Sequence, residues 1–124
     1  EGTKYIHKQG FLHRDIAPDN IYLKEDGMPI LIDFGAARDA IAEESKNISS
    51  IVKEGYSAPE QYTTNNKQNA SADIYALGAV FYRMITGKVP AGAAHRQTAL
   101  LNNDSDPVGD FTEAYRKNYT TKLL

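Results

Sequence analysis

Two short apolar runs joined by a tight polar turn constrain the fold of this chain more than any other feature. Residues 20–23 and 29–32 are rich in Ile and Leu, and Glu25-Asp26-Gly27 between them supplies a glycine for the turn. Short apolar runs around such a turn predict an antiparallel β-hairpin. The hairpin would bring the residues that precede it close to the residues that follow it.

Polar motifs flank the hairpin on both sides. His13-Arg14-Asp15 with Asn20 precedes it, and Asp33-Phe34-Gly35 begins thirteen residues after Asn20. Either motif alone could be an ordinary loop or turn whose side chains bond to their own backbone. Together they suit phosphoryl transfer, which needs a carboxylate near the attacking hydroxyl and oxygen ligands that hold Mg²⁺ against phosphates. The spacing is similar to that of a protein kinase catalytic loop.

Further motifs follow in the same order as in protein kinases. Ala58-Pro59-Glu60 comes after Gly55-Tyr56, and the segment 73–78 (DIYALG) opens an apolar stretch. Apolar residues three and four apart predict a helix over 71–86, ended by Gly87. Because the other side of this helix is apolar too, we expect it to be central and buried.

The remaining segments carry weaker signals. Residues 4–9 look like the end of a helix that Gly10 stops. No periodicity holds from 33 to about 62, which predicts a long surface segment of the kind that usually carries function. A short helix is expected near 96–101, and a last one from Thr112, with Phe111, Tyr115, Tyr119 and Leu123 on one stripe.

Taken together, the motifs resemble the C-terminal lobe of eukaryotic-like protein kinases, especially bacterial members, over about residues 5–90. The resemblance implies an α+β, protein-kinase-like fold: a mainly helical C-lobe with a small β-hairpin beside the catalytic loop, the N-lobe being absent. We interpret residues 1–124 as a partial protein kinase domain. Its parts are a catalytic loop at 13–20, an activation segment at 33–60 and a central helix at about 71–86.

The resemblance also implies catalytic roles. Asp15 would accept or orient the proton of the substrate hydroxyl, and Asn20 would ligate one Mg²⁺. Asp33 would ligate Mg²⁺ that bridges the phosphates of ATP, and Gly35 would let the backbone of this cofactor-binding segment swing. The cofactors implied are therefore ATP and Mg²⁺.

Structural roles are implied for four other residues. His13 would be a buried histidine rather than a proton carrier, and Phe34 would pack inward. Asp73 would accept hydrogen bonds from the catalytic-loop backbone. Glu60 would pair with a late arginine, but none follows Arg116. A buried carboxylate without its partner costs about 3–5 kcal/mol, so we expect the isolated chain to be marginally stable or molten, with the apolar faces of the 71–86 helix poorly covered.

A regulatory role is implied for Arg14. This arginine resembles the one through which many kinases sense a phosphorylated activation segment, because guanidinium pairs bidentately with phosphate. Ser45, Ser49 and Ser50 are the candidate acceptors. The alternative is that these serines belong to an ordinary solvated loop.

The chain departs from the usual serine/threonine kinase pattern at two positions. Ala17 stands where most of these kinases carry a lysine that steadies the γ-phosphate, and Lys53 stands where they carry Thr or Ser. We hypothesise that Lys53 folds back toward Asp15 and restores the lost charge as part of the catalytic set. The alternative is an exposed loop lysine. Because Ala at position 17 also occurs in tyrosine kinases, serine or threonine is favoured as acceptor only by overall resemblance.

The resulting interpretation is a protein kinase that transfers the γ-phosphoryl of Mg-ATP to a protein hydroxyl. A pseudokinase that regulates a partner is the main alternative, supported by Ala17, and a small-molecule phosphotransferase of the aminoglycoside type is another. A complete kinase also has a Gly-rich loop, a lysine and a glutamate in its N-lobe. None of these precedes Tyr5, so we expect negligible catalysis by this chain alone.

Composition limits the partners. Fourteen basic against sixteen acidic residues give a formal charge of −2, which predicts neither nucleic-acid binding nor attraction to an anionic membrane. The longest apolar runs are far shorter than the roughly 18 residues that cross a bilayer. With no cysteine, the chain fits a reducing, cytoplasmic location. The expected partners are ATP and a protein substrate.

Overall fold

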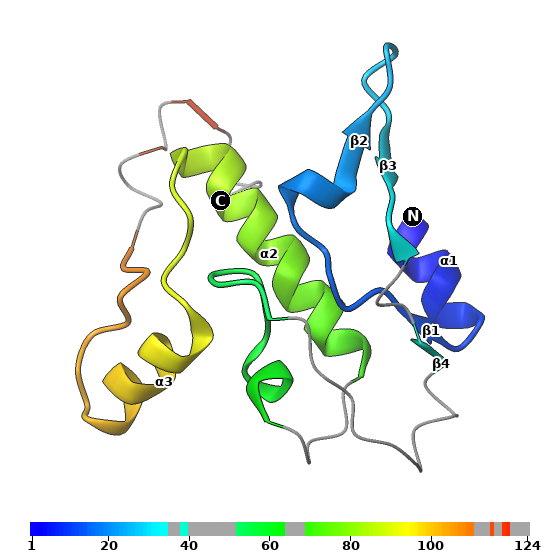
Figure 1. Cartoon of the computed structure of the whole chain (residues 1–124). Helices are drawn as coiled ribbons and strands as arrows, with labels where there is room; N and C mark the ends of the chain where they lie inside the picture. The colour runs from blue at the N-terminus through cyan, green and yellow to red at the C-terminus, as the bar shows by residue number, and fades with distance from the viewer. Residues whose placement is uncertain (35–37, 40–51, 64–68, 111–114, 116–117, 120–124) are drawn as a thin grey trace.

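Figure 1 shows the computed structural model of the chain, which describes residues 1–34, 38–39, 52–63, 69–110, 115 and 118–119. Its helices and strands, in chain order, are α1 (Gly2–Lys8), β1 (Phe11–Leu12), β2 (Ile21–Leu23), β3 (Pro29–Leu31), β4 (Arg38–Asp39), α2 (Ala70–Thr86) and α3 (Ala93–Leu101). Two 3-10 turns, η1 (Pro18–Asn20) and η3 (Pro59–Tyr62), accompany them. This mixture of helices with small antiparallel strand pairs confirms the α+β prediction.

The hairpin forms where the sequence predicts it. Strands β2 and β3 pair antiparallel with Ile21 opposite Leu31 and Leu23 opposite Pro29. Gly27 has φ +80° in the turn between them, a conformation that side-chain-bearing residues rarely adopt. The Ile32 N–H donates to the Asn20 carbonyl over 3.0 Å, so the segment after β3 runs beside the end of η1. A second pair, β1 with β4, was not predicted.

Helix α2 crosses the middle of the molecule (Figure 1) and extends from Ala70 to Thr86, one residue longer than the predicted 71–86. Asn69 caps its first turn by accepting the Ser71 N–H over 2.7 Å, and Gly87 ends it with φ +72°. These caps satisfy backbone groups that a helix leaves unpaired at its ends.

As expected for this chain, part of the apolar surface of α2 is left uncovered. Its buried side consists of Ala72, Asp73, Ala76, Ala79 and Val80. Elsewhere on the helix Ile74 is 57%, Phe81 50% and Met84 68% exposed. The loop of residues 13–20 covers the side of α2 that carries Ala76, Ala79 and Val80, where small residues allow close packing.

The core joins the loop of residues 13–20 to α2. Ile16 and Ala17 from the loop and Tyr56 from the later segment pack on Ala76, Ala79 and Val80 of the helix, with Ile21, Leu31 and Leu77 at the edge of the cluster. Ile16 and Ala17 are almost completely buried. The apolar residues of the loop thus anchor it, while its polar residues can point outward.

An ion pair ties α3 to the segment that follows it. The Arg96 guanidinium donates to both oxygens of Asp106, at 2.7 Å from Nη2 and 3.0 Å from Nε, and Nη1 donates to the Tyr75 hydroxyl on α2. The hydrogen bond from Arg96 lowers the pKa of Asp106. Helix α3 is the short helix expected near 96–101, begun three residues earlier.

Helices were predicted at both ends of the chain. Helix α1 is followed by Gly10 with φ +81°, the stop predicted for it. Most of the last predicted helix, from Thr112, lies outside the described residues, but the Tyr115 hydroxyl donates to the Thr86 carbonyl at the end of α2. No helix in the described ranges is long and apolar enough to cross a membrane.

Candidate active site

The backbone of the loop at 13–14 is fixed by one buried carboxylate. Asp73 on α2 accepts the His13 N–H over 2.9 Å and the Arg14 N–H over 2.8 Å. His7 Nε2 on α1 lies 2.7 Å from the same carboxylate. Asp73 therefore joins α1, the loop and α2, and it accepts the backbone hydrogen bonds that the resemblance implies for it.

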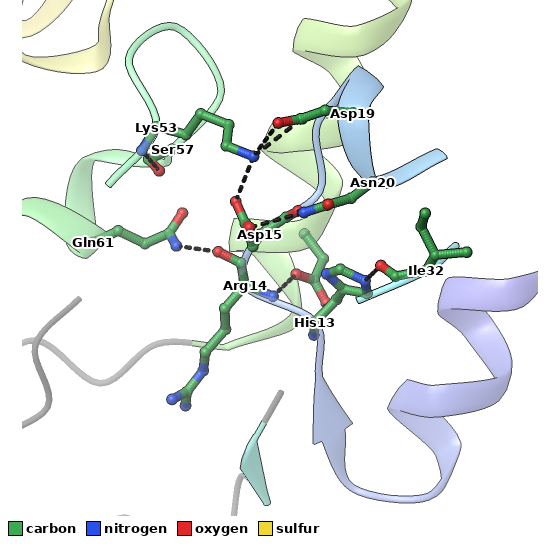
Figure 2. Close-up of polar contacts among 10 residues, drawn as sticks. His13, Arg14, Asp15, Asp19, Asn20, Ile32, Lys53, Ser57 and Gln61 are labelled. Carbon is green, nitrogen blue, oxygen red and sulfur yellow. Dashed lines mark hydrogen bonds and ion pairs between the residues drawn. The ribbon is translucent and has the colours of Figure 1, made fainter. Parts of the chain in front are cut away.

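The carbonyl group of Arg14 is held by the side chain of Gln61. Arg14 has φ +66°, a strained value for an arginine, and its carbonyl accepts a hydrogen bond from Gln61 Nε2 over 2.8 Å (Figure 2). The other end of the Gln61 amide, Oε1, accepts the Ala58 N–H over 2.9 Å. Gln61 is buried, and both ends of its side chain are used. It couples the 58–61 turn to the residue directly before Asp15.

Replacing Gln61 with Met should lower the free energy of unfolding by about 1–3 kcal/mol, because the Arg14 carbonyl and the Ala58 N–H lose their buried partner while the shape is nearly kept. Urea unfolding of the complete protein that carries this chain measures the change. Gln97→Met, at an exposed position of α3, is the matched control and should change stability by less than about 0.5 kcal/mol. Equal effects of the two substitutions would contradict the proposed coupling.

Asp15 lies between an amide and an ammonium (Figure 2). Asn20 Nδ2 donates to Asp15 Oδ2 over 2.8 Å and to the Asp15 carbonyl over 2.7 Å. Lys53 Nζ lies 3.1 Å from Asp15 Oδ1, and it also donates to both carboxylate oxygens of Asp19 over 3.0 Å. The Lys53 side chain is 29% exposed and turns back onto the loop rather than out into solvent.

The charges in this cluster stabilise one another. Burial disfavours the charged form of Lys53, but hydrogen bonds to Asp19 and Asp15 outweigh that cost and raise the pKa of Lys53. The hydrogen bond from Lys53 in turn lowers the pKa of Asp19. Because the pKa of Lys53 is raised, Lys53 stabilises the fold at pH values below the ordinary lysine pKa. Because the pKa of Asp19 is lowered, Asp19 stabilises the fold at pH values above the ordinary aspartate pKa. Lys53 and Asp19 are therefore both charged at neutral pH.

The residues beside Asp15 fit a magnesium ion. Both amide hydrogens of Asn20 are used by Asp15, which leaves the amide oxygen as the atom able to coordinate a hard cation. Asp33 is exposed, has φ +58°, and follows Ile32, whose N–H is bonded to the Asn20 carbonyl. The described residues contain no group of three or more His, Cys, Asp or Glu that could hold a metal. That is compatible with Mg²⁺ bound together with a nucleotide, where one or two protein ligands suffice.

The expected inward packing of Phe34 is only half right. Its ring lies on the completely buried His13 ring, with centroids 4.8 Å apart, but Phe34 is 47% exposed. His13 in turn contacts the Ile32 carbonyl through Nε2 at 3.2 Å. His13 is thus a buried histidine, and its ring contacts that of Phe34 at a tilt of 57°.

Glu60 is not the buried, unpaired carboxylate that was expected. Its carboxylate is only partly buried, and it accepts a hydrogen bond from the Ser71 hydroxyl over 3.3 Å. A partly solvated carboxylate with a partner does not carry the full cost of a buried lone charge. The expected penalty of about 3–5 kcal/mol from this residue is therefore wrong for the chain as it folds here.

Not all of the predicted regulatory and cofactor-binding residues lie in the described part of the chain. Gly35 and the candidate acceptors Ser45, Ser49 and Ser50 lie outside the described residues. Arg14 is buried at the loop. Its phosphate-sensing role therefore stays a prediction.

Sequence reasoning missed two polar partners of the site, Asp19 and Gln61. Asp19 lies inside the predicted catalytic loop, one residue before Asn20, and its sign complements Lys53. That charge pairing was a usable signal once Lys53 was expected to fold back. Gln61 gives no such signal, because a glutamine after a turn is usually on the surface.

Comparisons with known proteins agree with this geometry. The family model described as "Protein kinase domain" matches residues 1–121. The chain is similar to serine/threonine-protein kinase D of Synechocystis, 38% identical over 80% of this chain and 21% of that protein. It is also similar to the DNA damage-responsive serine/threonine-protein kinase RqkA of Deinococcus radiodurans, 34% identical over 86% of this chain and 16% of that protein. The chain thus spans about a fifth of the length of these relatives.

Proposed function

Because this chain belongs to the protein kinase domain family, we propose that the protein containing it transfers the γ-phosphoryl group of Mg-ATP to a serine or threonine hydroxyl of a protein substrate. The observation that carries the proposal is the position of Asp15, held by Asn20 on one oxygen and by Lys53 on the other. We assign residues 13–20 as the catalytic loop and 33–60 as the activation segment of a partial kinase domain, in a cytoplasmic protein.

Asp15 is proposed to receive the substrate hydroxyl. Its backbone neighbours are fixed by Asp73 and Gln61, so its carboxylate is aimed before substrate arrives. Such positioning lowers the barrier because the carboxylate does not have to reorganise during transfer. Orienting the hydroxyl and accepting its proton is the chemistry that this residue can supply.

Asn20 and Asp33 are proposed to hold Mg²⁺ through the Asn20 amide oxygen and the Asp33 carboxylate. The ion would neutralise negative charge on the phosphates. The hairpin supports this assignment, because it brings Ile32, the residue directly before Asp33, back to the Asn20 carbonyl.

Lys53 is proposed to supply the positive charge that Ala17 lacks. Position 17 is completely buried against α2, so its side chain does not reach the site. Lys53 approaches from the activation segment instead and places an ammonium 3.1 Å from Asp15. There it can stabilise charge on the transferring phosphoryl group.

Lys53→Ala should lower the turnover number of the complete protein at least about tenfold, because one fixed positive charge near the phosphate is lost. The comparison variant is Lys24→Ala, whose lysine forms an exposed pair with Asp26 at 3.4 Å on the hairpin. It should leave turnover unchanged. Wild-type turnover in Lys53→Ala would contradict the assigned role.

The acceptor class is tested by incubating the complete protein with Mg²⁺, ATP labelled in the γ position, and a generic protein substrate, then identifying the labelled amino acid. We expect phosphoserine or phosphothreonine, as the names of the bacterial relatives suggest. Phosphotyrosine would correct the acceptor. Transfer to an aminoglycoside offered in a parallel incubation, with none to protein, would support a small-molecule phosphotransferase, and no transfer to either would support a pseudokinase.

A further inference from the structure

The backbone of Lys53 is rigidly placed, but its side chain needs an anchor. The Lys53 N–H donates to the Ser57 hydroxyl over 2.8 Å, and the Lys53 carbonyl accepts the N–H groups of Tyr56 at 3.0 Å and Ser57 at 2.9 Å. Beyond Cα, a lysine has four rotatable bonds and a compact, hydrated charge, so its position is not fixed by its own packing. Whatever binds the ammonium therefore decides where the charge lies.

Asp19 provides most of that binding. The ammonium has three N–H donors, and three oxygens meet them: Asp19 Oδ1 and Oδ2, each at 3.0 Å, and Asp15 Oδ1 at 3.1 Å. Figure 2 shows Lys53 reaching over the loop between the two aspartates. Asp19 itself belongs to the 3-10 turn η1, directly before Asn20, so its backbone is part of the same rigid loop.

The simplest alternative is an incidental surface ion pair. The Asp19 side chain is 69% exposed, and exposed pairs contribute little to stability. That small stabilisation does not exclude a positional effect. Without Asp19, the ammonium would keep only Asp15 Oδ1, one of the two oxygens of the carboxylate that must receive the substrate hydroxyl.

We propose that Asp19 is a positioning residue that holds Lys53 beside Asp15, so that the ammonium stays at the reaction centre when Asp15 engages the substrate hydroxyl. The proposal rests on the proposed function of Asp15 and Lys53. The role proposed for Asp19 involves no contact with the hydroxyl or the phosphate, because Asp19 acts through Lys53. The ammonium is shared by two carboxylates, and Asp19 supplies two of the three oxygens that it meets, so that its position does not depend on Asp15 alone.

Asp19→Asn in the complete protein should lower the turnover number about three- to fivefold, the range that an exposed ion pair supports, with the KM for ATP changed less than about twofold. In a Lys53→Ala background the same substitution should have no further effect, because residues that act through one another are not additive. Asp19→Glu keeps the charge and should restore most of the activity. Asp26→Asn, in the exposed pair with Lys24, is the matched control and should leave turnover unchanged.

Two kinetic results would overturn the inference: an equal loss from Asp19→Asn with and without Lys53, or no loss in the wild-type background. A direct readout separates this failure from failure of the proposed function. Nuclear magnetic resonance titration of the Lys53 side chain should show a pKa above the ordinary lysine value that falls in Asp19→Asn but not in Asp26→Asn. Absence of phosphoryl transfer would defeat the proposed function alone, whereas a Lys53 pKa unchanged by Asp19→Asn would defeat the inference about Asp19.

Discussion

Asp15→Asn is expected to lower the rate of phosphoryl transfer by the complete protein about 100- to 10,000-fold, the range that a positioned acid or base contributes. The asparagine has nearly the same shape, and its oxygen can still accept the hydrogen bond from Asn20. It carries no charge to draw the proton of a hydroxyl or to pair with Lys53, which lies 3.1 Å away in the wild-type chain. The loss should therefore fall on turnover and not on nucleotide affinity.

Single-turnover kinetics measure this loss, and equilibrium binding of Mg-ATP checks that the site remains formed. Asp104→Asn is a suitable control because Asp104 is exposed in the segment after α3. It should behave like the wild type in both measurements. Turnover of Asp15→Asn within about tenfold of wild type would remove Asp15 from the role of base.

Asp73→Ala is expected to have the largest effect on stability, lowering the free energy of unfolding by about 3–5 kcal/mol. Asp73 is almost completely buried, and its carboxylate accepts the N–H groups of His13 and Arg14 and contacts His7. Alanine would leave these buried donors without their acceptor. Since a domain is stable by only about 5–15 kcal/mol, the loss is a large part of the total.

Urea unfolding of the complete protein tests this expectation, with Asp104→Ala as the exposed counterpart. Asp73→Asn should fall between wild type and Asp73→Ala, because an amide keeps one of the two acceptor oxygens. A loss below about 1 kcal/mol for Asp73→Ala would show that water or another group takes over the backbone donors, and that the carboxylate is not the tie between α1, the loop and α2.

Local pattern was enough to predict the elements that frame the site. The β2–β3 hairpin depends on two short apolar runs and one glycine turn, and the limits of α2 depend on its spacing and on Gly87. Both features are encoded within about twenty residues of sequence, where periodicity and turn chemistry are informative.

Contacts between distant residues were harder to predict. Gln61 meets the Arg14 carbonyl 47 residues away, and Lys53 meets Asp19 at a separation of 34. Which polar groups meet depends on how the activation segment packs on the loop. The periodicity of the sequence does not predict that packing. How much of α2 is covered depends on its neighbours in the same way, because an apolar sequence shows what can be buried but not which residues cover it.

The proposed function requires that the catalytic loop and the segment after the hairpin share one metal site next to Asp15. The direct test is a crystal structure of the complete protein with Mn²⁺ in place of Mg²⁺ and a non-hydrolysable ATP analogue, with the metal located by its anomalous scattering. We expect the metal within about 2.0–2.4 Å of the Asn20 amide oxygen and of an Asp33 carboxylate oxygen, next to the phosphates. Bound nucleotide whose metal lies away from both residues, or nucleotide bound without metal, would contradict the proposed function.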